Sequence, residues 1–490
     1  MQNLNFSAAL PEILLLIAAC AVLLADVLKR GVWGLDVGRT ALIVLILPVL
    51  AILAQLGQPA QHALNGMYVS DAMGHVLKLV ACAATAAALV YARSYAVDRG
   101  MHRGELYALA LFALLGQMIM ISAGNLLIVY LGLELMSLSL YAMAAMRRDH
   151  AISTEAAIKY FVLGALASGF LLYGMSMIYG GTGTLDLAKI SHSLGGLAPA
   201  NAKVLIFGVV FIVAGLAFKF GAVPFHMWVP DVYQGTPTVT TLLIASGPKL
   251  ATFAVAFRIL AGSLIGVASD WQQMLLVLSV LSMVLGNLVA IAQTNLKRML
   301  AYSAIAQIGF VLLGMLSGIV GGSTNGAADA WSASMFYLVA YVLTTLGTFG
   351  VMMLMSRDGH EADDIADLKG LGRRNPALAF VMLILMFSLA GIPPTIGFYA
   401  KLTVLKAVID AGMIWLAVLA VLMSLVGAFY YLRIVKTVYF DEPVDTHALS
   451  PLPSAHALLA INGALVLLLG LLPGPLMSLC ASAVKQAFGG

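Results

Sequence analysis

Residues 126–146 read LLIVYLGLELMSLSLYAMAAM, an apolar run that carries one carboxylate, Glu134, near its middle. A helix needs about 20 predominantly apolar residues to cross the hydrocarbon core of a bilayer. A formal charge at that depth costs roughly 2.5–3.5 kcal/mol on insertion scales, so such residues usually face the interior of a helix bundle and mark an ion pathway. The stretch therefore predicts a membrane protein with a functional charge inside the membrane.

Three further apolar runs each carry a lysine: Lys219 in VVFIVAGLAFKFGAVPF, Lys249 in TLLIASGPKLATFAVAF, and Lys401 in PPTIGFYAKLTVLKAVI. Burial disfavours the charged form of a lysine and a nearby carboxylate favours it, whereas arginine stays protonated in proteins. A glutamate that approaches or leaves Lys219 would therefore load or release one proton. We interpret Glu134, Lys219, Lys249 and Lys401 as proton-transfer groups.

The composition indicates a polytopic helical membrane protein. Hydrophobic residues make up 62% of the chain and charged residues only 10%, with a mean hydropathy of +0.99. The longest polar stretch, residues 355–377, is too short to build a core of its own, so residues 1–490 are predicted to form one transmembrane domain. The net charge of +4 describes loops and does not indicate nucleic-acid binding.

The cysteines give no sign of a metal or redox centre. Cys20, Cys82 and Cys480 stand singly in apolar segments, without the paired spacing of a metal site or an iron–sulfur cluster. We therefore expect no cofactor and no metal in this chain, and we expect any redox group to lie in a partner.

Hydropathy predicts fourteen spans, centred near residues 19, 47, 83, 113, 134, 166, 213, 248, 281, 307, 341, 391, 424 and 466. Most basic loop residues then fall on one side of the membrane: Lys29, Arg30, Arg39, Arg93, Arg99, Arg103, Arg147, Arg148, Lys297, Arg298, Arg357, Lys369, Arg373, Arg374, Arg433 and Lys436. Because cytoplasmic loops carry the excess of Lys and Arg, both termini are predicted to be periplasmic.

Prolines interrupt the predicted helices beside the lysines. Pro224 cannot donate a backbone hydrogen bond near Lys219, Pro248 directly precedes Lys249, and Pro393 with Pro394 frees the carbonyls of Leu389 and Ala390 before Lys401. Broken helices at membrane depth usually line a hydrated cavity. The seventh and twelfth helices are both predicted to be broken, and matching breaks in two halves indicate inverted repeats of five helices each.

Other polar side chains are placed near these charges by helical spacing. Tyr130, Ser137 and Tyr141 share a face with Glu134, His226 follows Lys219 at i+7, and Ser303 and Gln307 stand at i and i+4. Lys159 and Lys78 lie close to predicted helix ends, so a structural role stays open for both. Glu12 and Asp26 are expected to face water. A packing role also remains the alternative for Glu134 and for the three buried lysines.

Four segments carry a family resemblance: KFGAVPFHMWVPDVYQGTPTVTTLLIASGPKLATFAVAFRI, LKRMLAYSAIAQIGFVLLG, EAAIKYFVLGALASGFLLYG and SLAGIPPTIGFYAKLTVLKA. Together they resemble the antiporter-like membrane subunits of respiratory complex I, NADH-quinone oxidoreductase. The resemblance implies fourteen core helices with inverted repeats of roughly 104–262 and 270–438. It also implies proton-transfer roles for Glu134, Lys219, Lys249 and Lys401. Gln307 departs from the family pattern, because related subunits often have histidine there.

The implied function is proton translocation coupled to NADH oxidation and quinone reduction in other subunits. FMN and iron–sulfur clusters are then expected in partner subunits, with no direct NADH binding by this chain. The expected partners are other membrane-arm subunits, including antiporter-like ones, within the lipid bilayer of a bacterial inner membrane. The alternative is a subunit of a cation/proton antiporter that uses the same Glu and Lys sites.

Overall fold

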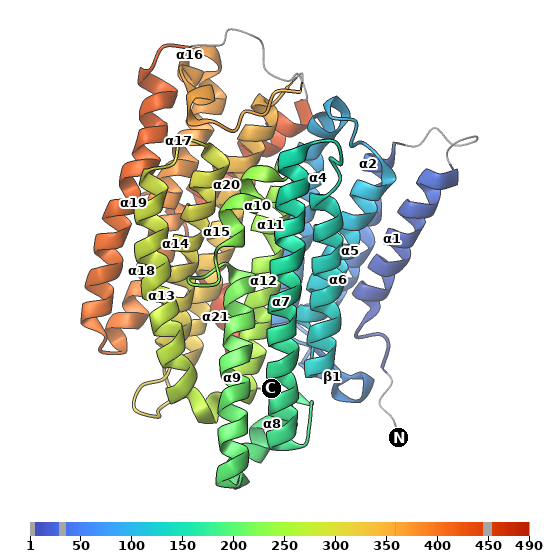
Figure 1. The fold of residues 1–490 in the computed structure, drawn as a ribbon, viewed down its shortest axis with the longest axis vertical. Helices are drawn as coiled ribbons and strands as arrows, with labels where there is room; N and C mark the ends of the chain where they lie inside the picture. The colour runs from blue at the N-terminus through green and yellow to red at the C-terminus, as the bar shows by residue number, and fades with distance from the viewer. Residues whose placement is uncertain (1–4, 29–35, 358, 444–452, 490) are drawn as a thin grey trace.

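A computed structural model describes residues 5–28, 36–357, 359–443 and 453–489 as a bundle of long helices that run side by side (Figure 1). The α-helices are α1 (Leu10–Leu28), α2 (Val37–Val44), α3 (Ile46–Gln55), α4 (Ala72–Asp98), α5 (Gly104–Ile121), α6 (Leu126–Ala144), α7 (Ala151–Thr182), α8 (Leu187–Ser193), α9 (Pro199–Phe220), α10 (Trp228–Gly235), α11 (Thr238–Ala245), α12 (Gly247–Ala256), α13 (Ala268–Ile291), α14 (Leu296–Leu316), α15 (Ala327–Met355), α16 (Leu371–Arg374), α17 (Pro376–Ala390), α18 (Ile396–Asp410), α19 (Ile414–Phe440), α20 (Pro453–Leu471) and α21 (Gly474–Gly489).

Shorter elements complete the chain. They are the antiparallel hairpin of β1 (Gln61–Ala63) and β2 (Tyr68–Ser70), the 3-10 turns η1 (Leu64–Gly66), η2 (Leu194–Gly196), η4 (Ile265–Val267) and η5 (Ile365–Leu368), and the π-helical segment η3 (Phe257–Ser263).

The predicted all-α polytopic fold is confirmed. Within the described residues, thirteen segments are long and apolar enough to cross a membrane. The remaining predicted span, the twelfth, centred near residue 391, is present as two shorter helices, α17 and α18, with a break between them. Thirteen long candidate segments and one span divided into two shorter helices together account for the fourteen predicted spans.

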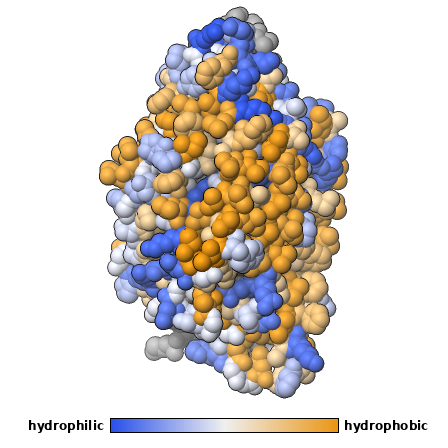
Figure 2. Space-filling view, turned by 90° about the vertical axis from the view of Figure 1, so that its left-hand side faces the viewer, coloured by the Kyte–Doolittle hydropathy of each residue, from blue (hydrophilic) through white to orange (hydrophobic). Residues whose placement is uncertain are grey.

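The centre of the bundle holds the helices that carry the candidate site. Nearly every residue of α11, α12, α14 and α15 is buried, whereas α1, α19 and α20 lie at the periphery. α19, at the left-hand edge of Figure 1, exposes apolar side chains such as Val418, Leu425 and Phe429. Figure 2 shows that side of the molecule, where apolar residues cover a broad middle area and the top is mostly hydrophilic. Lipid is the expected environment of such a surface.

Glycines end the helices that break at the site. α9 ends at Phe220 and is followed by Gly221, whose φ of 78° is left-handed, and α17 ends at Ala390 and is followed by Gly391 with a φ of 82°. Left-handed backbone is costly for residues with a side chain, so glycine at these two positions lets the chain turn inside the bundle. The predicted breaks in the seventh and twelfth helices are confirmed.

The basic loops named above meet at one end of the bundle. Arg99 after α4 and Arg147 after α6 both bind Glu361, which lies between α15 and η5. In Figure 1, α16 and its two arginines lie at the top, whereas α8 and β1 lie at the bottom. Lys29 and Arg30 lie outside the described residues.

Candidate functional site

The first part of the site lies between α6 and α9. Glu134 is half-buried on α6, and its Oε1 is buried without a hydrogen-bond partner among the described residues. Lys219, in the last turn of α9, donates from Nζ to Ser137 Oγ at 2.9 Å. Ser137 stands one helical turn after Glu134 on the same face of α6. The described residues include no direct ion pair between Glu134 and Lys219, so the serine hydroxyl connects the two helices.

Two tyrosines continue the face of α6 that carries Glu134. Tyr130 stands one helical turn before Glu134 on α6. Tyr141 packs edge-on against the ring of Tyr160, with centroids 4.6 Å apart. Tyr160 in turn stacks on Trp228 of α10. These aromatic contacts join α6, α7 and the segment after the break of α9.

One expected neighbour of Lys219 is displaced. Because α9 ends at Phe220 and the chain turns at Gly221, Lys219 and His226 do not share a helix face, and the expectation from i+7 spacing is wrong. His226 lies half-buried in the turn before α10, where its carbonyl accepts from the amide of Val229. Pro224 predicts this break, and a helical period does not continue through it.

The middle of the site is Lys249, which follows a second break. α11 ends at Ala245, α12 begins at Gly247, and Lys249 is buried with Nζ 5.2 Å from the ring centre of Tyr341 on α15. Ser246 and Thr252, which flank the lysine, donate to carbonyls of their own segment, those of Leu242 and Pro248. The Lys249 ammonium therefore lies over the ring of Tyr341, whose face attracts a cation.

Gln117 of α5 lies against the same break and was not predicted. A Cβ added at Gly247 would come within 2.2 Å of Gln117 Oε1, an oxygen that is buried and has no hydrogen-bond partner among the described residues. A buried amide without a partner is costly, and a water molecule commonly satisfies it. A glutamine in an apolar span was the available signal, but only the fold places it beside Lys249.

Gln307 of α14 joins three other helices. Its Nε2 donates to the carbonyl of Leu389 in α17 at 3.0 Å and to Tyr431 Oη at 3.0 Å, and Tyr337 Oη donates to its Oε1. Ser303, one turn earlier, lies 2.5 Å from the same Tyr431 hydroxyl. The expectation that Ser303 and Gln307 share a polar face is confirmed, and the Leu389 carbonyl freed by Pro393 has a partner.

The far part of the site is Lys401 on α18. Its Nζ donates to the carbonyl of Ala390 at 2.8 Å and to Ser424 Oγ of α19 at 2.7 Å. Ala390 is the last residue of α17, so the lysine satisfies the second carbonyl that the prolines free. The ring centre of Phe310 lies 5.2 Å from the ammonium. Lys401 and Gln307 thus donate hydrogen bonds to neighbouring carbonyls, those of Ala390 and Leu389, at the end of one broken helix.

Two other lysines stand apart from these groups. Lys159 is 42% exposed and pairs with Asp231 and Glu155 at 2.8 Å each, at the surface rather than beside Lys219. Lys78 is fully buried, with Nζ 2.5 Å from Glu12 Oε1 and 2.8 Å from Tyr68 Oη. The expectation that Glu12 faces water is therefore wrong, because Lys78 of α4 compensates its charge inside the protein. Asp26 is half-buried and accepts from the amide of Gly104.

Comparison with known proteins gives a consistent result. Residues 123–427 match the family model described as NADH:quinone oxidoreductase/Mrp antiporter, TM. NADH-quinone oxidoreductase subunit N of Herminiimonas arsenicoxydans is 56% identical over 489 residues, which is 99% of each chain. The subunit N of Nitrosomonas europaea is 53% identical over 99% of this chain and 98% of its own.

Solved structures share the fold along almost the whole chain. A chain of respiratory complex I from Thermus thermophilus has a TM-score of 0.81 and 35% identity, and the match covers 96% of this chain and 99% of that one. A chain of an archaeal membrane-bound sulfane sulfur reductase has a TM-score of 0.86 and 25% identity, with 98% and 97% covered. A chain of the Mrp complex from a Dietzia species has a TM-score of 0.83 at 22% identity over 99% and 98%, which shows the fold alone.

Proposed function

This chain belongs to the family of NADH-quinone oxidoreductase subunit N, and from that premise we propose that protons cross it through Glu134, Lys219, Lys249 and Lys401. It is an antiporter-like, proton-pumping subunit of the membrane arm of bacterial respiratory complex I and a multi-pass membrane protein. The redox reaction of the complex is the oxidation of NADH by quinone. What the family does not fix is the role of each residue in this chain.

One observation carries the proposed path: two of the three lysines beside helix breaks, Lys219 and Lys401, are each bound to a serine of a neighbouring helix. Lys219 binds Ser137 of α6 at 2.9 Å, and Lys401 binds Ser424 of α19 at 2.7 Å. A hydroxyl can accept from an ammonium and donate to a neutral amine, so it can stay bonded in both protonation states of the lysine. Tyr341, Gln307 and Tyr431 supply further polar groups between Lys249 and Lys401.

The proposed switch is the distance between the Glu134 carboxylate and the Lys219 ammonium. Burial disfavours the charged amine, and an approaching carboxylate favours it. In this structure Lys219 bonds to Ser137, and Glu134 Oε1 has no hydrogen-bond partner in the described part of the chain. A rotation of either side chain would bring the charges together and load a proton on Lys219, and the reverse rotation would release it toward Lys249.

Inverted repeats of roughly 104–262 and 270–438 are part of the proposal. Asn125 caps α6 and forms a backbone bridge with Asp186, and Asn295 likewise caps α14 and bridges Asp364. α8, which directly follows Asp186, lies at the bottom of Figure 1, whereas α16, which follows Asp364, lies at the top. The same construction at opposite ends supports two units of inverted orientation.

The basic end of the bundle, with Arg99, Arg103, Arg147 and Arg148, is proposed to be cytoplasmic. α1 begins beside the β hairpin, where Ala8 and Ala9 pack with Ala63 and Tyr68, so the start of α1 would be periplasmic. A membrane-impermeant maleimide is expected to label Ser7→Cys from the periplasmic side. Labelling only from the cytoplasmic side would reverse the orientation.

Other membrane-arm subunits, including antiporter-like ones, are the proposed neighbours, and FMN and iron–sulfur clusters are proposed to lie in other subunits of the complex. The expectation of no cofactor in this chain stays a prediction. An independent cation/proton antiporter is disfavoured by the full-length identity of 53–56% to subunit N proteins.

The proposed path is tested with substitutions at its first pair in the assembled complex. Lys219→Ala is expected to lower proton pumping by roughly tenfold or more, because a positioned proton-transfer group is lost. Glu134→Asp keeps the charge and should retain more activity than Glu134→Gln. Pumping and NADH–quinone turnover are measured in membranes with matched subunit content.

The exposed ion pair of Lys485 and Asp329, with an N–O distance of 3.1 Å, offers matched controls. Lys485→Ala and Asp329→Asn are expected to pump like wild type. Normal pumping by Glu134→Gln between pH 6 and 9, a range above the ordinary pKa of a carboxyl group, would exclude the carboxylate from proton transfer.

A further inference from the structure

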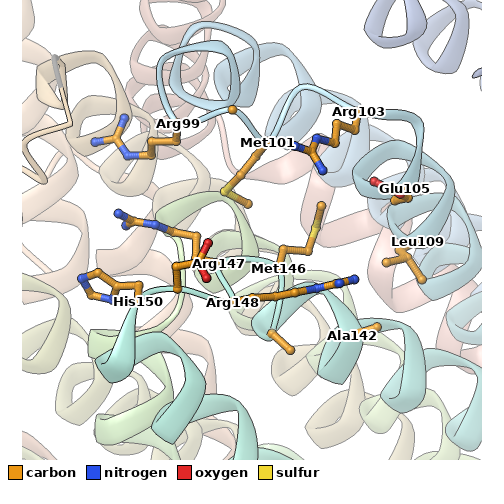
Figure 3. A pocket seen from close by; sticks show the side chains of 13 residues that line it. Arg99, Met101, Arg103, Glu105, Leu109, Ala142, Met146, Arg147, Arg148 and His150 are labelled. Atoms are coloured by element: carbon orange, nitrogen blue, oxygen red, sulfur yellow. The ribbon is translucent and has the colours of Figure 1, made fainter. Parts of the chain in front are cut away.

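A cavity of about 820 Å³ opens at the basic end of the bundle, between the loop joining α4 to α5 and the end of α6 (Figure 3). Four arginines line it, Arg99, Arg103, Arg147 and Arg148, against two carboxylates, Glu105 and Asp149. The excess positive charge indicates an anionic ligand. None of the proposed proton-transfer residues lines this cavity.

The arginines fall into two pairs with different partners. Arg99 and Arg147 are bound to Glu361, with N–O distances of 2.9 and 3.2 Å. Arg103 and Arg148 are exposed and have no ion pair with any described residue. In Figure 3, Arg99 and Arg147 extend to the left of the view, whereas Arg148 extends toward Leu109, on the side where Arg103 also lies. Two guanidinium groups are therefore available to a ligand.

The position of the cavity favours a lipid over a soluble anion. α5 begins at Gly104 and α6 ends at Ala144, so the cavity lies where two adjacent spanning helices leave the apolar region. Leu109, Ala142 and Met146 also line it and continue its wall with apolar side chains. A free phosphate ion would use only the arginines, whereas a phospholipid would use both the arginines and this wall.

We propose that this cavity binds the phosphate group of an anionic phospholipid, with Arg103 and Arg148 as its ligands and the acyl chains along Leu109 and Ala142. Guanidinium groups bind phosphate oxygens through charge-assisted, often paired hydrogen bonds. Basic pockets between spanning helices on the cytoplasmic side suit anionic headgroups in general. Arg99 and Arg147 stay bound to Glu361 and do not contact the phosphate. They contribute to the electrostatic potential of the cavity from that position.

The experiment uses a photo-crosslinking residue. The whole complex with p-benzoylphenylalanine in place of Ala142, an exposed residue of the cavity wall, is reconstituted in vesicles of equal parts phosphatidylcholine and phosphatidylglycerol. Mass spectrometry of the crosslinked peptide gives the ratio of captured phosphatidylglycerol to phosphatidylcholine. We expect phosphatidylglycerol to predominate, and the ratio to fall about fivefold or more when Arg103→Gln and Arg148→Gln are combined.

Two control variants separate binding from general effects of charge. The double variant Arg103→Lys, Arg148→Lys keeps both positive charges and should keep most of the phosphatidylglycerol enrichment. Lys189→Gln removes a solvent-exposed charge far from the cavity and should leave the lipid ratio unchanged. An unchanged lipid ratio in the Gln pair would overturn the proposal. So would capture of a peptide from another subunit, or loss of the enrichment on adding inorganic phosphate, which would point to a free anion site.

Discussion

Lys401 is the residue whose surroundings most constrain its chemistry. Its ammonium bonds to the Ala390 carbonyl and to Ser424, and the backbone turn at Gly391 packs so closely that an added Cβ would lie 2.7 Å from Lys401 Cδ. The side chain is thus held in one position beside a broken helix. A group in that position can serve either as a proton carrier or as a fixed positive charge.

Lys401→Arg separates these two roles, because arginine keeps the charge but does not release its proton in proteins. We expect the variant to assemble and to pump several-fold more slowly than wild type, measured as proton uptake by inverted membrane vesicles driven by NADH.

Lys406→Arg is the matched control for this substitution, since Lys406 lies on the same helix and is exposed. It should behave as wild type. If Lys401→Arg pumped normally while Lys401→Ala failed to assemble, Lys401 would be a structural residue.

The breaks in the helices, rather than the helices themselves, create the polar groups of the site. The carbonyls of Leu389 and Ala390, at the end of α17, accept hydrogen bonds from Gln307 and Lys401 instead of from a following helical turn. Helix termini leave unsatisfied carbonyls, and inside a bundle these need partners from other elements. Elements far apart in the chain are therefore joined at the break by polar contacts.

Gly391→Ala is expected to damage this junction more than backbone strain alone would explain. A left-handed φ with a side chain costs about 1 kcal/mol, and here the new methyl group also meets Lys401. We expect reduced pumping together with a lower melting temperature of the complex. Gly322→Ala supplies the comparison, because Gly322 has the same φ of about 83° with open space around it. Equal effects of the two substitutions would show that the Lys401 contact is irrelevant.

At the scale of the whole molecule, Glu361 joins the two halves of the chain at the basic end. It lies between α15 and η5 and accepts hydrogen bonds from Tyr95 and Thr238 as well as from Arg99 and Arg147. Thr238 begins α11, the segment before the break that precedes Lys249. The carboxylate thus fixes the start of that segment to α4 and to the loop after α6.

The pKa of Glu361 predicts how this junction responds to acid. Burial raises the pKa, but the positive charges of Lys297 and Arg99 outweigh it and hold the pKa below its ordinary value of 4.5. A lowered folded-state pKa contributes stability that is complete above the unfolded pKa and is lost as pH falls through the folded one. Glu361→Gln should therefore lower the melting temperature of the complex by a few degrees at pH 7, and the difference should shrink below about pH 4.

Glu442→Gln is the corresponding control, because Glu442 is 77% exposed and pairs with Arg373 at the surface. Its melting temperature should match that of wild type at both pH values. A constant difference between Glu361→Gln and wild type over the whole pH range would mean that Glu361 does not act through its charge.

The spans, the helix breaks and the charges inside the spans can all be predicted from local stretches of the sequence. Apolar runs predict membrane helices because the bilayer requires internal hydrogen bonding of the backbone. Prolines and glycines at 221–224 and 391–394 predict interruptions because they remove donors and permit left-handed turns. Charges such as Glu134 and Lys401 stand out because few residues in such runs are polar. All of these are local properties of the chain.

Which polar groups meet depends instead on how separate helices pack against one another. Ser137 with Lys219, Ser424 with Lys401, and Gln307 with Tyr337 and Tyr431 are contacts between helices that sequence spacing cannot relate. The i+7 spacing does not bring His226 beside Lys219, because a helical period does not continue through the turn at Gly221. Glu12 does not face water, because Lys78, on another helix 66 positions later, pairs with it inside the protein. A buried charge is tolerated when an opposite charge packs against it, and the packing of separate helices is what supplies that charge.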